Sequence, residues 1–459
     1  MKTIIRISCF SLLCLQTAAQ AAPAGSLWDM GEISDDALGN GHQGGAVVQY
    51  LPQLVVTNNV VAVAALNDSL LLKSDGSLWI TGDQSVGDGT NVTSTNFFTM
   101  IVTNGVTAMA AGGDQNLFIK SDGSLWGFGE DNNGELGIAP YGTTEYSPAM
   151  IVPSGVVAVA AGVNHSLFLK NDGSLWAMGY NIDGQLGDSN YNASDVPVMV
   201  VPSGVTAIAA GYHFSLYIMN NGSLWGMGDN GAGELGATNT YPFYNTDVPV
   251  KIVPGGVTAV AAGDDYTLFL KNDGTLWGMG DGGVGELGNG TNLEIPTPTK
   301  IAFSNVVAIA AGAETSLFIR SDGSLWGTGE EGSGQLGVSS GSIPPSGYVL
   351  QPVMIESRGV VAIASGEDAS LFVQTTPAPV IVKISVSGAN VILQATNGVA
   401  NGIYYTLESS VASLPLTQWS PLETNTLGAT LNASGSFTVT VTNAFNPAKP
   451  PEFFVLTTP

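Results

Sequence analysis

Basic side chains are scarce in this sequence. Its 459 residues include 12 Lys and Arg against 37 Asp and Glu, which gives a formal net charge of −25 at pH 7. Nucleic acids and anionic lipid surfaces both attract basic proteins. We therefore expect no nucleic-acid partner, and any macromolecule drawn to this chain by charge would be basic.

Long hydrophobic runs are also missing, because the apolar stretch at residues 4–15 is too short to span a bilayer. It follows Lys2 and Arg6 and precedes Ala19-Gln20-Ala21, an order typical of a cleaved export signal. We predict a signal peptide over residues 1–21, no membrane insertion, and a secreted, periplasmic or cell-surface location.

Cysteine is confined to this segment, at Cys9 and Cys14. Cleavage would leave a mature chain without disulfides, and loss of the two bases of the signal would change the net charge from −25 to −27. The three histidines, His42, His165 and His213, lack metal-ligand spacing. We therefore expect no zinc site and no cofactor, with calcium left open as an alternative.

Glycine and hydrophobic residues are plentiful: there are 60 glycines, and 44% of the chain is hydrophobic against 11% charged. This composition favours short strands joined by tight turns, so the predicted fold class is all-β. A string of the form Gly-Ser-Leu-Trp or Gly-Thr-Leu-Trp recurs about every fifty residues, a period typical of propellers and solenoids. Its tryptophans stand at positions 28, 79, 126, 176, 225, 277 and 326.

Each repeat predicts four strands. In one copy the first is the Val/Ala alternation at 156–161, the second is 165–170, the third carries the Trp, and the fourth is 196–201. An Asp-Gly or Asn-Gly pair between the second and third strands predicts a two-residue hairpin turn. The repeated Trp side chains are interpreted as structural.

The ends of the array predict closure. Residues 25–31 supply a third strand without the first two, and residues 360–374 supply the first two without a third. Joining these halves would remove exposed sheet edges. We therefore predict a seven-bladed β-propeller over 25–374, closed by the N-terminal strands, in a monomeric protein.

The order Val-x-Ala-Val-Ala-Ala-Gly, Asp-Gly-x-Leu-Trp, then Gly-[Gln/Glu]-Leu-Gly at 134–137, 184–187, 233–236, 285–288 and 334–337 resembles the repeats of the regulator of chromosome condensation family. The resemblance implies a seven-bladed propeller, a fold that hosts unrelated binding roles. Among proteins of this type, the secreted beta-lactamase inhibitor protein II offers the nearest analogy, because it is exported and binds through loops on one face. No motif in this chain transfers its target.

In this topology the loops after the first and third strands share one face. About three-quarters of the 37 acids fall in those loops, and Lys73, Lys120, Lys170, Lys271 and Arg320 occupy one position toward the opposite face. The acidic loops would either bind a partner or keep the protein soluble. Loop aromatics at 212–214 and 240–244 add binding anchors. The candidates for this binding face are Asp114, Asn164, Tyr212, His213, Phe214, Tyr241, Phe243, Tyr244, Asp264, Asp265, Tyr266, Glu314 and Asp368.

The sequence predicts no catalytic residue. Residues 337–341 match G-x-S-x-G but lie in a Ser/Gly-rich loop rather than at a strand-to-helix turn. We predict a non-enzymatic binding protein whose acidic loop face meets a protein or glycan. The alternative is a carbohydrate-active or carbohydrate-binding surface protein.

Beyond a short linker at 375–379 the repeat pattern stops. Strands are expected at 380–387, 390–395, 403–409, 437–441 and 453–456. We predict a small β-sandwich over 380–459, similar to immunoglobulin or fibronectin modules.

Overall fold

A computed structural model gives the fold of the chain. It describes residues 24–32, 38–39, 48–82, 87–89, 95–113, 115–138, 140, 142–236, 245–338 and 346–375, together with the backbone of six strands between 380 and 457. The chain divides into two compact units, residues 1–375 and 376–459. The predicted signal peptide lies outside the described residues. Within them, no helix is long and apolar enough to cross a membrane.

The first unit contains five antiparallel sheets of four strands each, in chain order within every sheet. They are β6 (Val106–Ala111), β7 (Gln115–Lys120), β8 (Leu125–Asp131) and β9 (Thr143–Val152); β10 (Val156–Ala161), β11 (His165–Lys170), β12 (Leu175–Gly179) and β13 (Ser194–Val201); β14 (Val205–Ala210), β15 (Phe214–Met219), β16 (Leu224–Gly228) and β17 (Thr246–Val253); β18 (Val257–Ala262), β19 (Tyr266–Lys271), β20 (Thr275–Gly280) and β21 (Ile295–Ser304); β22 (Val306–Ala311), β23 (Thr315–Arg320), β24 (Leu325–Glu330) and β25 (Tyr348–Glu356). The four-strand reading of the repeat is confirmed.

The remaining strands of this unit form one seven-stranded sheet. Its order is β26 (Val360–Ser365), β27 (Ala369–Gln374), β1 (Gly25–Glu32), β2 (Val48–Ala65), β3 (Ser69–Lys73), β4 (Leu78–Gly82) and β5 (Thr95–Val102). The long strand β2 serves two groups of four, because its first part pairs with β1 and its last part with β3. Asn59, with a φ of 64°, lies between the two parts.

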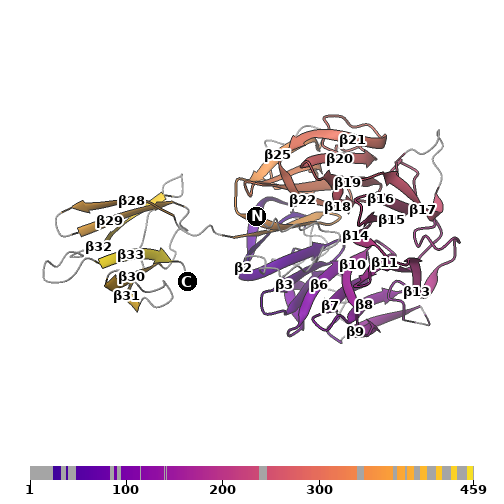
Figure 1. Ribbon diagram of the computed structural model, residues 1–459, viewed down its shortest axis with the longest axis horizontal. Helices are drawn as coiled ribbons and strands as arrows, with labels where there is room; N and C mark the ends of the chain where they lie inside the picture. Colours follow the sequence, from indigo (N-terminus) through magenta and orange to yellow (C-terminus); the bar gives the residue numbers. More distant parts are fainter. Residues whose placement is uncertain are drawn as a thin grey trace. The chain divides into compact units, whose positions relative to one another are not determined.

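The first strands of the sheets lie toward the centre of the unit and the fourth strands lie at its periphery (Figure 1). Each first strand contacts the first strand of the next sheet, and β26 contacts β2. Small side chains permit this crowding: Ala160, Ala209 and Ala310 are fully buried. A Cβ added at Gly211 would lie 2.6 Å from the carbonyl oxygen of Gly263 in the next sheet.

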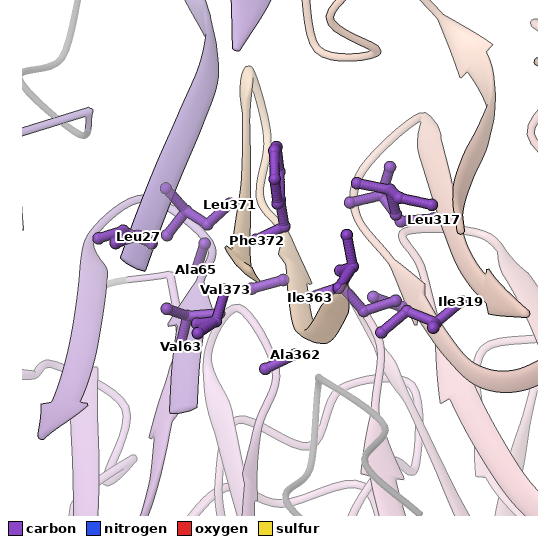
Figure 2. Close-up of a cluster of buried hydrophobic side chains, with 14 of the residues drawn as sticks. Leu27, Val63, Ala65, Leu317, Ile319, Ala362, Ile363, Leu371, Phe372 and Val373 are labelled. Atoms are coloured by element: carbon purple, nitrogen blue, oxygen red, sulfur yellow. The ribbon is translucent and has the colours of Figure 1, made fainter. Parts of the chain in front are cut away.

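Strands from the two ends of the repeat region share one apolar core. Strand β1 pairs with β27 from Ser26↔Gln374 to Gly31↔Ala369. Figure 2 shows Leu27 of β1 and Leu371 of β27 in the same cluster as Val63 of β2. The buried apolar surface of this cluster therefore links sequence segments more than three hundred residues apart.

Every described hairpin turn between the second and third strands holds the Trp of the third strand. In the β11–β12 turn the indole Nε1 of Trp176 donates to Ser174 Oγ at 2.9 Å, and Ser174 Oγ donates to Asp172 Oδ1 at 2.6 Å. The Ser174 hydroxyl and amide lower the pKa of the Asp172 carboxyl. The same relay recurs at Trp79, Trp126, Trp225, Trp277 and Trp326.

The repeated bases complete this arrangement. The Nζ atom of Lys170 lies 4.4 Å from the centroid of the Trp176 ring, which stacks on Phe168 with 6.1 Å between ring centroids. Lys73, Lys120, Lys271 and Arg320 stand over the Trp rings of their own sheets in the same way. A cation above an indole face is attracted by the ring quadrupole, so these bases stabilise the sheet.

The turn itself differs from the predicted two-residue hairpin. The amide of Gly173 donates to Lys170 O at 2.9 Å, and the amide of Lys170 donates to Ser174 O at 3.0 Å, so three residues form the loop. Gly173 has a φ of 80°, whereas Asp172 does not have a positive φ. A type I turn followed by a left-handed glycine fits these values. The prediction of a two-residue loop was therefore wrong: Asp172 lies inside a three-residue loop, where its carboxylate accepts hydrogen bonds from the amide and hydroxyl of Ser174.

The second unit contains two three-stranded sheets: β28 (Val380–Ser387), β29 (Asn390–Thr396) and β32 (Ser436–Val441), and β31 (Ser420–Asn425), β30 (Tyr404–Ser410) and β33 (Glu452–Thr457). The five strands expected here are present, and β31 was not anticipated. The immunoglobulin- or fibronectin-like classification stays a prediction.

We predict that Ser174→Ala lowers the free energy of unfolding by about 1 kcal/mol, because the half-buried Trp176 indole loses its hydrogen-bond acceptor. Ser174→Thr should be nearly neutral, since Thr275 makes the same two hydrogen bonds in its own repeat. Urea titration of both variants measures the difference. Equal midpoints for Ala and Thr would contradict a stabilising role for the relay.

Asp29 occupies a position in β1 that is glycine or alanine in several other third strands, such as Ala177. Its side chain is fully buried, neither carboxyl oxygen has a hydrogen-bond partner, and burial raises its pKa from 3.8 to about 8. A carboxyl whose pKa is higher in the folded state costs stability as the pH rises from 3.8 to about 8.

We therefore predict that Asp29→Ala stabilises the protein, on the order of a few kcal/mol at pH 7 and much less near pH 4. Thermal melts at the two pH values test this prediction. An advantage that did not grow with pH would show that folding does not hold the Asp29 carboxyl protonated above its ordinary pKa.

Candidate binding surface

The loops after the first and third strands meet on one side of the unit, here called the loop face. It comprises the β10–β11, β12–β13, β14–β15, β16–β17, β18–β19, β20–β21, β22–β23 and β24–β25 loops. Within a sheet, the residue that ends the third strand or begins the following loop donates its amide to a carbonyl of the first loop. These pairs are Tyr180 to Asn164 (2.8 Å), Asp229 to His213, Asp281 to Asp265 and Glu330 to Glu314 (2.9 Å each), and Glu32 to Asp368 at the adjoining β1–β27 edge (2.9 Å).

Several acids assigned by sequence to these loops are structural rather than exposed. Asp131 is fully buried and its Oδ1 accepts the amide of Leu136 at 2.8 Å, as Asn181 does for Leu186 in the next sheet. Glu331 is buried and accepts the amide of Leu336. The loop face therefore exposes fewer carboxylates than the sequence count implied.

Two predicted contact residues, Phe214 and Tyr266, are buried, with 0% and 1% of their surface exposed. Each is the first residue of a second strand, β15 or β19, rather than part of a loop. The Tyr266 hydroxyl donates to Thr315 O of the next sheet at 3.0 Å. Their assignment to a binding face was wrong because the side chain at this position points between sheets.

Four further candidates, Asp114, Tyr241, Phe243 and Tyr244, lie outside the described residues. Asn164, Glu314 and Asp368 lie on or beside the loop face, with Glu314 exposed and the other two half-buried. They come from three different sheets, and Glu314 lies close enough to Asp264 for its charge to raise the pKa of that carboxyl.

An aromatic group does gather at the junction of two sheets. The ring of His213 lies 4.5 Å from that of Tyr212 and 5.5 Å from that of Tyr180, measured between centroids. Tyr212 is 42% exposed. Tyr180 comes from the β12–β13 loop and the other two from the β14–β15 loop, so the group bridges successive repeats.

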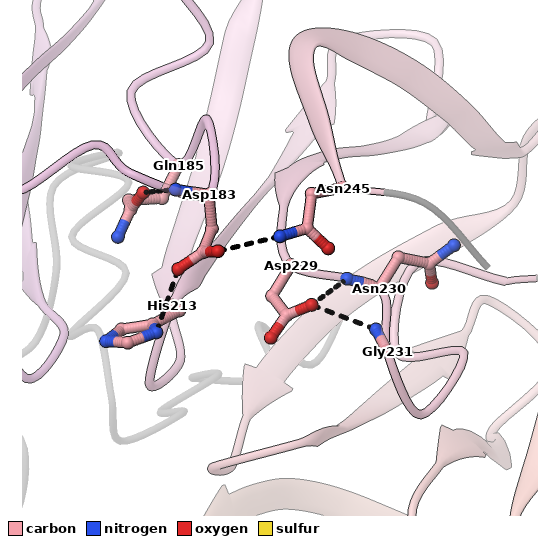
Figure 3. Close-up of polar contacts among 7 residues, drawn as sticks. All are labelled: Asp183, Gln185, His213, Asp229, Asn230, Gly231 and Asn245. Carbon is pink, nitrogen blue, oxygen red and sulfur yellow. Dashed lines mark hydrogen bonds and ion pairs between the residues drawn. The ribbon is translucent and has the colours of Figure 1, made fainter. Parts of the chain in front are cut away.

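His213 also contacts a carboxylate across the same junction. Its Nδ1 lies 3.0 Å from Asp183 Oδ2, and Asn245 donates to Asp183 Oδ1 at 2.7 Å (Figure 3). Burial raises the pKa of Asp183, while His213 opposes that shift. The imidazole is therefore held over the loop face by a partner from the preceding repeat.

Next to it, three carboxylates converge. Asp229, Glu234 and Asp265 each place an oxygen within 4.8 Å of the others. Burial raises the pKa of Glu234 to about 8, and the charges of Asp229 and Asp265 add to the shift. The pKa of Asp265 is raised as well, by burial and by Asp229 and Asp281, against the opposing effect of His213.

Asp264 extends this negative region. Burial raises the pKa of its carboxyl to about 7, with contributions from Asp265, Glu367 and Glu314. The surface thus combines an exposed aromatic side chain, an imidazole and several acids within three successive sheets. The sequence predicted Tyr212, His213, Asp264 and Asp265 as contact residues. It placed Asp183, Asp229 and Glu234 only among the many acids of the same loops, and it did not identify Tyr180. An alignment of the chain's own repeats would have matched Tyr180 to Asp229, since both follow the third-strand glycine.

Comparisons with known proteins address the fold. Two models described as the regulator of chromosome condensation (RCC1) repeat match residues 156–185, 205–234, 257–286 and 306–335, and residues 122–169, 172–218, 221–270 and 273–319. The chain carries RCC1 repeats. A comparison with curated protein sequences found no match.

Solved structures of RCC1-like propellers resemble this chain. Human WBSCR16 is 21% identical, with a TM-score of 0.67 over 76% of this chain and 99% of that protein. Prp20p, the RCC1 protein of Saccharomyces cerevisiae, is 18% identical in its complex with Kap60, with a TM-score of 0.69 over 82% of this chain and 94% of that one. At these identities the likeness shows a shared β-propeller fold.

We predict that Tyr266→Phe lowers the free energy of unfolding by about 1 kcal/mol without changing the loop face. The hydroxyl bonds to groups between sheets, Thr315 O and the Ser316 hydroxyl. Chemical denaturation gives the stability change, and binding of the variant to any captured partner should equal that of the parent chain.

Proposed function

We propose that the first unit is a closed seven-bladed propeller. The pairing of β1 with β27, the contact of β26 with β2, and the division of β2 between two groups of strands support this architecture. Together with the five four-stranded sheets, the two groups would make seven blades. The second unit would be a small β-sandwich that acts as a spacer or accessory module.

We propose further that this protein is an exported, non-enzymatic binding protein that recognises a protein partner through the loop face. The observation that carries this proposal is the junction of Tyr180, Tyr212 and His213 beside a cluster of acids. A half-exposed tyrosine supported by other rings is a common anchor of protein interfaces, because it buries a large rigid area at low entropic cost.

The chemistry of the junction favours a basic partner. Asp229, Glu234 and Asp265 lie together, and the described part of the loop face contains no Lys or Arg. Proteins with these repeats bind other proteins: Prp20p is described with its binding to Gsp1p and histones, and in complex with Kap60. Export, inferred from the N-terminal signal, would place the partner of this chain outside the cytoplasm.

A glycan is the second candidate partner. Tyr212 exposes 42% of its surface and has a neighbouring imidazole, and sugar rings stack on exposed aromatic faces. A glycan would depend on the aromatic rings more than on the acids, whereas a basic protein would depend on both.

We predict that a Tyr212→Ala, His213→Ala double variant of the mature chain captures its partner from the extracellular milieu at least tenfold more weakly, since loss of an interface anchor costs about 2 kcal/mol or more. Phe97→Ala is the matched control, because Phe97 is 61% exposed on β5 and lies outside the loop face. Quantitative pull-down and a glycan array run in parallel separate the two partner classes. Equal capture by the double variant and the parent would exclude this junction as the binding site.

A further inference from the structure

The carboxylates of Asp229, Glu234 and Asp265 have a geometry that electrostatics alone does not explain. Their oxygens lie within 4.8 Å of one another, and none of the three forms an ion pair with a Lys, Arg or His among the described residues. Asp229 and Glu234 belong to the loop after β16, whereas Asp265 comes from the β18–β19 loop of the next sheet. Two sheets therefore bring three like charges to one point.

The hydrogen bonds of the group involve only some of its carboxylate oxygens. Asp229 Oδ1 accepts the amides of Asn230 and Gly231 at 2.7 and 2.9 Å, which fixes its side chain (Figure 3). Glu234 Oε2 accepts the amide of Ala232 at 3.0 Å. The Glu234 side chain is 0% exposed, and its other oxygen, Oε1, is buried without a hydrogen-bond partner.

A fully buried carboxylate oxygen without a partner is costly unless a proton or a cation compensates it. We propose that Asp229, Glu234 and Asp265 bind one Ca²⁺ ion. Ca²⁺ takes six to eight oxygen ligands at about 2.3–2.6 Å, so two ligand oxygens on opposite sides of the ion are at most about 5 Å apart. The 4.8 Å limit within the trio meets this condition.

The three side chains differ in exposure, which gives a cation a path from solvent to the buried carboxylate. Asp265 is exposed, Asp229 is half-buried and Glu234 is buried. An ion arriving from solvent would meet Asp265 first and would finally contact Glu234. The three side chains supply only part of the coordination shell, and water would complete it, so the dissociation constant expected is about 10⁻⁴–10⁻³ M, as in extracellular calcium modules.

The repeats themselves provide a comparison within the molecule. In the preceding sheet, the positions of Asp229, Glu234 and Asp265 are held by Tyr180, Gln185 and His213, which cannot form a carboxylate site. In the following sheet they are held by Asp281, Glu286 and Glu314, three acids again. Among the residues that the structure describes, Asp229, Glu234 and Asp265 are the only group of three or more His, Cys, Asp or Glu residues whose ligand atoms all lie within 4.8 Å of one another.

The test uses the full mature chain, freed of metal by a chelator and then titrated with CaCl₂ at constant ionic strength. We expect Ca²⁺ at 10 mM to raise Tm by about 2 °C or more, because binding to the folded state alone stabilises it. Glu234→Gln should abolish this shift or weaken the Ca²⁺ affinity at least tenfold. Gln stands at the same position in two other repeats, as Gln185 and Gln335, so this variant is expected to fold.

Two further variants keep the outcome decisive. Asp265→Asn, at an exposed position, should also remove the shift, whereas Glu286→Gln, the matching change in the next sheet, should retain it. Absence of a Ca²⁺-dependent shift in the parent chain would overturn the proposal. An equal shift in the parent and Glu234→Gln would do so as well, since it would indicate general screening of the acidic face. Loss of the shift in Glu286→Gln would overturn the assignment to this trio.

Discussion

The hydrogen-bonded relay from the hairpin turn to the Trp indole sets the geometry of six repeats. It joins three residues of the turn and third strand, Asp172, Ser174 and Trp176 in one copy, and it orients the ring. The ring then stacks on an aromatic residue of the second strand and receives the ammonium group of a Lys. Turn, strand register and lateral packing therefore depend on one short chain of bonds.

Because this relay lies at one end of the strands, the opposite end is free to vary. The loops at that end share one backbone hydrogen bond. In several sheets the residue after the third-strand glycine donates its amide to a carbonyl of the loop between the first and second strands. The side chains at these positions differ, as Asn164, His213, Asp265 and Glu314 illustrate. Uniform backbone bonding with changing side chains is the arrangement expected where a rigid scaffold supports a recognition surface.

The fold was predictable because its signals are local and repeated. Strand identity followed from alternation in the Val/Ala and Ser-Leu-Trp strings, and the period of about fifty residues indicated the architecture. The turn type was not predictable from Asp-Gly alone, since the deciding factor is the bond from Asp172 to Ser174. Likewise, Phe214 and Tyr266 look like loop aromatics in sequence, although they begin strands and reach the next sheet.

The site was less predictable, because it depends on contacts between repeats. Counting acids in the loops treats Asp131 and Glu234 alike, and both accept a backbone amide within their own loop. Glu234, however, also lies beside Asp229 of that loop and Asp265 of the next sheet. Sequence position cannot separate these cases, since the same loop motif contains Glu or Gln. The two cases differ in the neighbouring side chains. Beside His213 and Tyr180 the motif contains Gln185, which carries no charge, whereas beside two aspartates it contains Glu234. The backbone contact does not require an acid, because Gln185 accepts the Asp183 amide as Glu234 accepts the Ala232 amide. A third carboxyl beside two others is compensated by a proton or by a cation, and the proposed Ca²⁺ ion would supply the cation.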